Sequence, residues 1–400
     1  MPEAVIVATA RSPIGRANKG SLVECRPDDL AATIVRAALA KVPQLDPELV
    51  EDVLLGCGEP AGEAGYNLAR VVALLAGLPN APGVTVNRYC SSSLQTIRMA
   101  FHAIKAGEGD VFVAAGVETV SRFSYGVADM GPHNPAFAKA EARTAERQQG
   151  ASSWEPPDGL PDIYIAMGQT AENVRLLENV SRLEMDEFAC LSQQRAVQSQ
   201  QDGFFAREIT PITTPSGTVV TKDDGPRPGT TVEILAGLQP VFRPDGQITA
   251  GNSCPLNDGA AAVVVMSDHK ARELGITPLA RIVASGVSAL NPEIMGLGPV
   301  EASRQALRRA GMTIDNIDLV EINEAFAAQV IPSARHLGIP WDKLNVNGGA
   351  LALGHPYGMT GARIMTTLLN GLQTAGKTLG LETMCVGGGQ GMAMIVERLN

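Results

Sequence analysis

The chain has 400 residues, of which 45% are hydrophobic and 18% charged, and it carries a formal net charge of −10. This composition is typical of a soluble globular protein, and the length predicts two or more domains. The excess of acidic residues argues against a general nucleic-acid or membrane-surface binder. No apolar run approaches the roughly 18 residues that cross a bilayer, so no membrane partner is expected.

The first residues predict a strand rather than an export signal. Residues 4–10 (AVIVATA) form a short apolar run, Glu3 precedes it, and no basic segment leads into it. The six cysteines form no CxxC pair and no cluster with zinc-type spacing. We therefore expect free thiols, no bound metal and a cytoplasmic location.

The first 120 residues alternate between strand and helix patterns. Apolar runs at 4–10, 50–56, 83–89 and 110–118 predict strands, and amphipathic patterns at 28–42, 67–78 and 91–107 predict helices. This alternation is typical of a parallel sheet with crossover helices, which places the chain in the α/β class.

The middle of the chain, about residues 122–250, has a different character. The stretches 143–162 and 213–231 are polar and rich in proline and glycine, which predicts loops, whereas 168–180 and 181–203 show helix patterns. We interpret this part as an inserted subdomain of helices and long loops, a frequent place for substrate recognition.

The last part of the chain repeats the pattern of the first. After a strand at 259–268, strands are predicted at 279–287, 316–322, 344–350 and 379–399, and helices at 298–311, 325–338 and 360–373. Residues 37–56 resemble residues 305–324, and the pair Val86 and Asn87 recurs as Val346 and Asn347. We therefore expect two similar halves, 1–270 and 275–400, with a site where matching loops meet.

Cys90 lies between a predicted strand and a predicted helix, in the stretch VNRYCSSSLQ. Leu94, Ile97 and Ile104 recur at helical spacing, and Ser91 is a favourable residue for a helix start. A cysteine at a helix N-terminus is favoured as a thiolate, which predicts a nucleophile. A buried structural cysteine is the alternative that the local sequence leaves open.

Three other positions carry candidate chemistry. His355 lies in the glycine-rich segment NGGALALGHPYGMTGAR, where it is either a general base or a residue that caps a turn. Cys385 ends an apolar strand before glycines 387–389, whose backbone can approach a ligand closely. A nucleotide-binding loop is the alternative there, but the helix and the downstream acid of that fingerprint are missing. Asn323, at a strand-to-helix junction, is either an N-cap or a donor to a reacting carbonyl oxygen.

Taken together, these motifs resemble the thiolases (acetyl-CoA C-acyltransferases). The resemblance rests on NRYCSSSLQ around Cys90, NEAFA at 323–327, NVNGGALALGHPYGMTGAR at 345–363 and CVGGGQGMA at 385–393. ARSPIG at 10–15, MGQTAENV at 167–174 and TAGNSCPLNDGAAA at 249–262 extend it over nearly the whole chain. It implies the thiolase fold, with two similar βαβαβαββ halves in a layered αβαβα arrangement and an inserted loop subdomain.

The resemblance also implies a mechanism. His355 would take the proton of Cys90, and the thiolate would attack an acyl-CoA thioester to give an acyl-enzyme. Cys385 would be the second acid and base. One oxyanion hole would use His355 and a water held by Asn323, and the other would use the backbone N–H groups of Cys90 and Gly387. No metal or redox cofactor is implied, because the thioester already acidifies the α-carbon, and coenzyme A is a substrate.

Positions that match the family's CoA contacts lie between residues 227 and 326. Arg227 would lie near the adenine end and Cys254 along the CoA channel. The pantetheine contacts would be Val241, Phe242, Ala250, Met295, Ala325 and Phe326.

Several residues depart from the family pattern. Ala166 stands where acetoacetyl-CoA thiolases often carry histidine, which leaves room for longer 3-oxoacyl chains. Cys254 stands where many relatives have serine, and Tyr357 and Met359 are bulkier than their usual counterparts. The resemblance further implies fatty-acid β-oxidation and a homodimer or homotetramer.

Two other functions compete with an active thiolase. A β-ketoacyl synthase on a similar fold would pair its cysteine with two histidines, whereas this chain offers one histidine and a second cysteine. A lipid-binding or carrier protein without catalysis would lack one of the reactive groups. Because Cys90, Asn323, His355 and Cys385 are all present, the sequence predicts an active enzyme.

Overall fold

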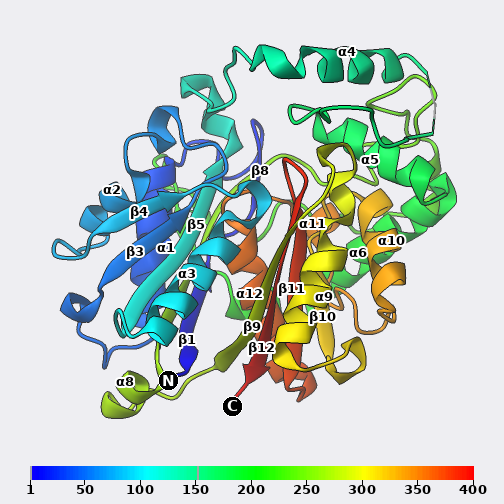
Figure 1. Ribbon diagram of the computed structural model, residues 1–400. Coiled ribbons are helices and arrows are strands. Elements are labelled where there is room, and N and C mark those ends of the chain that lie inside the picture. The colour runs from blue at the N-terminus through cyan, green and yellow to red at the C-terminus, as the bar shows by residue number, and fades with distance from the viewer. Residues whose placement is uncertain (1, 151–152) are drawn as a thin grey trace.

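A computed structural model describes residues 2–150 and 153–400. Met1, within the first predicted half, and Ala151 and Ser152, within the loop predicted at 143–162, lie outside the described residues. Figure 1 shows the first half of the chain in blue and cyan and the last part in yellow and red, joined side by side.

The centre of the molecule is one mixed sheet with the strand order β10-β11-β12-β9-β1-β8-β5-β3-β4, and β2 pairs with β8. The halves meet where β1 and β9 run antiparallel, with Val5 opposite Arg281. The strands are β1 (Ala4–Arg11), β2 (Gly15–Arg16), β3 (Asp52–Gly56), β4 (Gly83–Val86), β5 (Val111–Thr119), β8 (Asn257–Ser267), β9 (Ala280–Ala289), β10 (Leu319–Ile322), β11 (Leu379–Val386) and β12 (Gln390–Arg398).

The two halves share one topology. In the first half the strand order is β4-β3-β5-β8-β1, and in the second it is β10-β11-β12-β9. Leu344 forms a single parallel bridge to Val320 on the outer side of β10 and completes the second half. Numbered along the chain, the five positions of each half then follow the order 3-2-4-5-1, which is the internal repeat that the sequence predicts.

Helices cover the sheet in layers. Helices α1 (Pro27–Ala40) and α2 (Leu68–Leu75) cover one face of the first half, and α9 (Gly298–Ala310) and α10 (Ala327–Leu337) cover one face of the second. Between the halves, α3 (Ser92–Ala106) and α12 (Thr360–Ala375) pack against each other. Three hydrophobic clusters lie between these three groups of helices and the two halves of the sheet, which gives the layered αβαβα arrangement.

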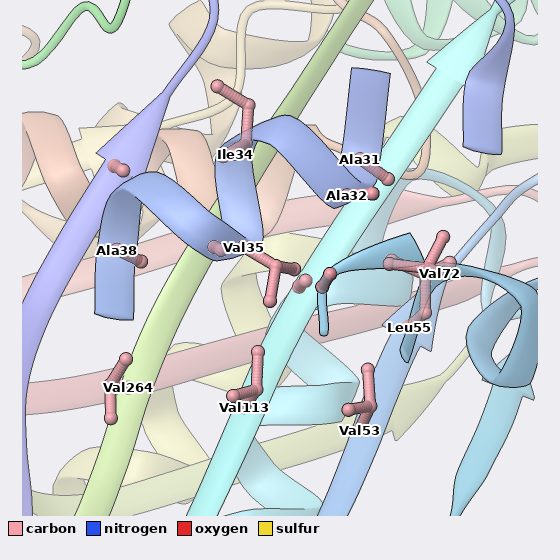
Figure 2. Packing of buried hydrophobic residues seen from close by; sticks show 14 of the residues in the cluster. Ala31, Ala32, Ile34, Val35, Ala38, Val53, Leu55, Val72, Val113 and Val264 are labelled. Carbon is pink, nitrogen blue, oxygen red and sulfur yellow. The ribbon is translucent and has the colours of Figure 1, made fainter. Parts of the chain in front are cut away.

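Helix α1 illustrates how sequence produces a layer. Pro27 occupies its first turn, where a missing N–H is tolerated, and two acidic residues favour the same end. Figure 2 shows Val35 of this helix facing Val113 of β5, with Val264 of β8 and Val53 of β3 on either side. Each such valine contributes about 1.5–3 kcal/mol when buried.

The segment between β5 and β8 forms the insertion, residues 120–256. Figure 1 shows helix α4 crossing above the sheet, and α5 and α6 lie below it on the side of α10. The two helices predicted at 168–180 and 181–203 are present as α5 and α6. The insertion contains α4 (Ala138–Arg147), α5 (Met167–Leu177), α6 (Arg182–Gln201), β6 (Ile212–Thr213), β7 (Val219–Val220) and α7 (Val232–Ala236).

Two predicted elements were wrong. Residues 143–147, expected in a loop, form the last half of α4, because KAEARTAER has few helix-breaking residues and only its flanks carry proline and glycine. The strand expected at 344–350 is reduced to the bridge at Leu344, after which Asn345 turns with φ 45°. Residues Ala350–Leu353 form a short helix, α11, and Asp268–Glu273 form α8 after β8.

None of the helices that the structure describes is both long and apolar enough to cross a membrane. All six cysteines are free.

Candidate active site

Cys90 lies at a sharp turn between β4 and α3. Tyr89, immediately before it, has φ 43°, a left-handed conformation that is rare for a bulky residue. Two side chains hold this turn: Asn87 Oδ1 accepts from the Tyr89 N–H at 2.8 Å, and Ser92 Oγ accepts from the Arg88 N–H at 2.9 Å. Ser91, the expected cap, makes no capping hydrogen bond. The strained turn therefore presents Cys90 from a rigid support.

Cys90 is 8% exposed, and burial raises the pKa of its thiol to about 11. The backbone N–H groups of Gly387 and of Cys90 itself act in the opposite direction, because they favour the thiolate. Gly387 directly follows β11, so the sulfur lies where the two halves of the chain meet. The helix start alone does not make this thiol a thiolate, and a base is needed.

His355 is buried and held on three sides. Its backbone N–H donates to Asn257 Oδ1 at 3.0 Å. In the ring, Nδ1 lies 2.6 Å from Thr360 Oγ1, and Nε2 lies 3.3 Å from Asn323 Nδ2. The single hydroxyl hydrogen of Thr360 goes to the Pro356 carbonyl at 2.8 Å. Nδ1 must therefore be the protonated nitrogen, which leaves the lone pair on Nε2.

The electrostatics of His355 agree with a neutral ring. Burial, and secondarily the charge of Arg363, lowers the pKa of His355 to about 3. A neutral imidazole whose Nε2 carries no hydrogen is the form that accepts a proton from a thiol.

Asn323 follows β10 and is 1% exposed. Its backbone donates to the Thr383 carbonyl at 3.0 Å, and its own carbonyl accepts from Gln329 Nε2 at 2.7 Å. Its side-chain Oδ1 has no hydrogen-bond partner among the described residues. A buried amide oxygen of this kind is suited to bind a water molecule.

Glu324 links this strand end to the loop that precedes His355. Its carboxylate accepts from Ser192 Oγ at 2.6 Å, from Asn345 Nδ2 at 2.8 Å and from the Leu351 N–H at 3.0 Å. Asn345 in turn exchanges two hydrogen bonds with the backbone of Ile322. This network fixes Asn323 and the histidine loop relative to each other.

Three thiols share the site. Cys385, in β11, is fully buried, and burial followed by the neighbouring Cys90 and Cys254 raises its pKa. Cys254 is likewise affected first by burial and then by Cys90, and its pKa is raised to about 12. Cys254, expected along the CoA channel, therefore lies beside both reactive cysteines.

Tyr357 also belongs to the site. Its ring meets the His355 ring edge-on with 5.2 Å between centroids. Burial raises the pKa of its hydroxyl, followed by the proximity of Cys254 and Cys90.

Glu118, at the end of β5, is a supporting residue that sequence reasoning missed. Its buried carboxyl accepts from the N–H groups of Gly58 at 2.7 Å, Glu59 at 3.1 Å and Gly358 at 2.8 Å. It therefore joins the loop after β3 to the turn that follows His355. The available signal was an acid that ends the otherwise apolar strand VFVAAGVE.

The predicted CoA contacts fall into three groups. Arg227 and Ala250 line a cavity of about 50 Å³ together with Arg16, which sequence reasoning missed. Val241 stands apart and is exposed. The others share one hydrophobic cluster, in which Phe242 and Phe326 meet edge-on at 6.2 Å: Phe242, Cys254, Met295, Ala325 and Phe326.

Met295 is only 1% exposed, so its side chain supports this cluster from behind.

Within the residues that the structure describes, no three His, Cys, Asp or Glu side chains gather as a metal site would require. The absence of a metal or redox cofactor stays a prediction.

A larger cavity of about 460 Å³ opens at Cys90, and we call it the acyl pocket. It lies between the catalytic turn and the insertion, and it includes Ala166, the position that departs from the family pattern. Its lining consists of Gly58, Glu59, Asn87, Tyr89, Cys90, Ala128, Asp129, residues 163–167, Tyr357, Gly387 and Gly388.

Comparisons with known proteins agree with this geometry. Residues 4–269 match the family described as "Thiolase, N-terminal domain", and residues 276–398 match "Thiolase, C-terminal domain". The chain is 45% identical over 409 residues, the full length of both chains, to the 3-oxoadipyl-CoA/3-oxo-5,6-dehydrosuberyl-CoA thiolase of Escherichia coli. It is 42% identical over 411 residues to the 3-ketoacyl-CoA thiolase of Bacillus subtilis, covering 99% of this chain and 100% of the relative.

Solved structures show the same fold. The dimeric peroxisomal thiolase of Saccharomyces cerevisiae aligns with a TM-score of 0.90 and 35% identity, covering 100% of this chain and 98% of that one. The acetyl-CoA acetyltransferase of Bacillus anthracis aligns with a TM-score of 0.85 and 38% identity, covering 100% and 99%. This chain has the thiolase fold, belongs to the thiolase family and is an acyltransferase.

Proposed function

We propose that this thiolase cleaves 3-oxoacyl-CoA with CoA, through an acyl-Cys90 intermediate, and that it also runs the reverse condensation. One observation carries the assignment: a buried Cys90 thiol with two N–H donors on its sulfur shares a site with Cys385 and with a histidine whose Nε2 is unprotonated. These are a nucleophile, a second acid and a base.

In the first half-reaction, His355 Nε2 takes the proton of Cys90 and the thiolate attacks the 3-oxo carbon of the substrate. The bond between carbons 2 and 3 then breaks. Its electrons go to the acetyl-CoA fragment, which takes a proton from Cys385, and the shortened acyl group stays on Cys90. In the second half-reaction, Cys385 removes the proton of the CoA thiol and the resulting thiolate attacks the acyl-cysteine. Cys90 leaves and recovers its proton from His355.

Two groups of hydrogen-bond donors stabilise the oxyanions. The N–H groups of Cys90 and Gly387 face the sulfur and are placed to donate to the oxygen of the tetrahedral intermediate. His355 Nε2, once it holds the proton of Cys90, and a water on Asn323 Oδ1 would donate to the oxygen of the acetyl-CoA enolate, since that amide oxygen otherwise lacks a partner among the described residues. Oxyanion donors of this kind are worth about 3–4 kcal/mol each.

The names of the relatives support the class of substrate, since both the Escherichia coli and the Bacillus subtilis enzymes are named for 3-oxoacyl-CoA esters. Fatty-acid β-oxidation is one pathway that needs this activity, and the degradation of oxoadipyl groups is another. We also propose a homo-oligomer, by likeness to the yeast structure described as dimeric. Light scattering coupled to size-exclusion chromatography tests it, and a monomeric mass refutes it.

The enzymatic proposal is tested with acetoacetyl-CoA and 3-oxooctanoyl-CoA in the presence of CoA, by following loss of the enolate absorbance. Thiolysis of at least one ester is expected, with no added metal or redox cofactor. Incubation with acetyl-CoA alone should leave an acetyl group on the peptide that contains Cys90, measured by mass spectrometry. A Cys90→Ser variant with full activity would refute the nucleophile, and a lack of thiolysis at every chain length would refute the function.

A further inference from the structure

The acyl pocket has an unusual distribution of charge. Two carboxylates line it, Glu59 and Asp129, and among its described lining residues none is lysine, arginine or histidine. Glu59 is fixed there, because its Oε2 accepts from the N–H groups of Ala128 at 2.8 Å and Asp129 at 3.3 Å. The remaining polar lining includes the neutral hydroxyls of Tyr89, Tyr164 and Tyr357.

Two cationic side chains near this rim are already engaged. His133 stacks on Tyr164 at 3.8 Å and is shared between Asp129 at 3.6 Å and Glu141 at 3.1 Å. Arg122 donates twice to Glu63, at 2.6 and 2.7 Å. One imidazole between two carboxylates leaves the rim negative even when that ring is protonated.

The charge is opposite in the smaller cavity. Arg16 and Arg227 line it without an acidic residue among its described lining, where the anionic groups of CoA are expected. The enzyme thus presents cations to one part of an acyl-CoA and carboxylates to the other.

We propose that the acyl pocket accepts 3-oxoacyl groups without charge and discriminates, through Glu59 and Asp129, against groups that end in a carboxylate. This inference rests on the proposed thiolase function and narrows its substrate class. An acyl anion in this pocket would face two like charges with no cation to pair with, whereas a neutral chain meets tyrosine rings and hydroxyls. The Escherichia coli relative is named for 3-oxoadipyl-CoA, whose acyl group ends in a carboxylate. Among its described lining residues, the acyl pocket of this chain offers that carboxylate no cation.

A matched pair of substrates tests the proposal: 3-oxoadipyl-CoA and its terminal monoamide, which has nearly the same shape and no charge. We expect kcat/KM to favour the amide by about tenfold or more at low salt. The ratio should fall as sodium chloride is added, because exposed charges are screened. Equal kcat/KM values for the two esters, or a preference for the carboxylate, would overturn the proposal.

Variants separate charge from shape. Glu59→Gln keeps an oxygen that accepts from the 128–129 backbone, and Asp129→Asn keeps the side-chain size. Each should raise the carboxylate-to-amide ratio by about threefold or more, whereas Asp315→Asn, which removes an exposed charge in the other half, should leave it unchanged. A ratio that neither pocket variant moves would overturn the role of these carboxylates.

A failure of this selectivity proposal can be told apart from a failure of the proposed thiolase function. If no ester is cleaved, including 3-oxooctanoyl-CoA, the thiolase function fails. The selectivity is then decided by calorimetric binding of the same two esters, where equal dissociation constants would overturn it.

Discussion

Thr360 determines which nitrogen of His355 is the base. Its Oγ1 lies 2.6 Å from Nδ1 and gives its own hydrogen to the Pro356 carbonyl, so it can only accept from Nδ1–H. In a Thr360→Val variant of nearly equal size, Nδ1–H loses this acceptor. The hydrogen then moves to Nε2, where a rotated Asn323 amide can offer its otherwise unpartnered Oδ1. That tautomer has no lone pair directed at the Cys90 proton.

The size of the effect follows from the lost hydrogen bond. A buried donor without a partner costs about 1–3 kcal/mol, which changes the ratio of tautomers by about 5- to 150-fold. We expect kcat/KM for thiolysis to fall by a factor in this range. Thr360→Ser, which keeps the hydroxyl, should retain most of the activity.

Two measurements check the reasoning. The first is thiolysis of 3-oxooctanoyl-CoA by the valine and serine variants, at equal concentrations of folded protein as judged by thermal melting. The second is the nitrogen-15 spectrum of His355, which reports the tautomer without reference to activity. If the valine variant keeps its kcat/KM within about twofold, or loses activity while Nδ1 stays protonated, Thr360 does not act through the tautomer.

Three further predictions concern residues that support the site. Burial raises the pKa of Glu118 to about 7 from an ordinary value of 4.5, so its stabilising effect is full below pH 4.5 and is lost as the pH rises through 7. A Glu118→Gln variant should lack this dependence, worth about 3 kcal/mol, in urea unfolding between pH 4.5 and 8. Glu293 accepts from Arg143, Arg147 and Trp154, so Glu293→Gln should loosen α4, speed tryptic cleavage within 127–165 and raise KM for acyl-CoA. A Cβ on Gly361 would lie 2.3 Å from the Leu94 backbone nitrogen, so Gly361→Ala should lower the free energy of unfolding by about 1–3 kcal/mol.

Each of these has a control on the same chain. The dependence of unfolding on pH should persist in Glu59→Gln, and an unaltered profile in the Glu118 variant would contradict the assignment. Glu301→Gln, on the surface of α9, should leave tryptic cleavage unchanged, and equal cleavage in the Glu293 variant would show that α4 is held elsewhere. Gly371→Ala, in the same helix as Gly361 but in looser surroundings, should be neutral or stabilising, so two equal effects would refute the close helix contact.

Elements with strong periodicity could be predicted from sequence. The paired helices α3 and α12 and the strands of both halves have continuous apolar faces, so local pattern and tertiary packing agree. The prediction of a strand at 344–350 was wrong because side-chain hydrogen bonds replace the backbone hydrogen bonds of a strand there. The side chain of Asn345 exchanges two hydrogen bonds with the backbone of Ile322, and these hold the chain in a turn. Helix α4 was missed because its flanking prolines and glycines obscured its own helical composition.

The candidate site likewise contains residues that could be predicted from the sequence and residues that could not. Cys90, His355 and Cys385 could be proposed from motifs, because each lies beside glycines, prolines or a helix start that leave a trace in the sequence. Thr360 and Glu118 lie in no sequence pattern that indicates their roles, since these roles depend on which atoms of other loops they contact. The charge of the acyl pocket is of the same kind: Glu59 and Asp129 are 70 residues apart, and only the fold brings them together.

The electrostatics of the catalytic groups explain why so many supports are needed. Burial raises the pKa of Cys90 and lowers that of His355, so both shifts favour the neutral pair over a thiolate and an imidazolium in the resting enzyme. The thiolate is then stabilised only where donors are already fixed, which here are the N–H groups of Cys90 and Gly387. In the resting enzyme the groups around the reacting atoms are uncharged: backbone amides, the Asn323 side chain and an imidazole. Charge therefore develops only during the reaction, and a site of this kind gains its rate from donors that need no rearrangement at that moment. The tautomer set by Thr360, the turn strained at Tyr89 and the carboxyl of Glu118 all serve to keep those donors in place.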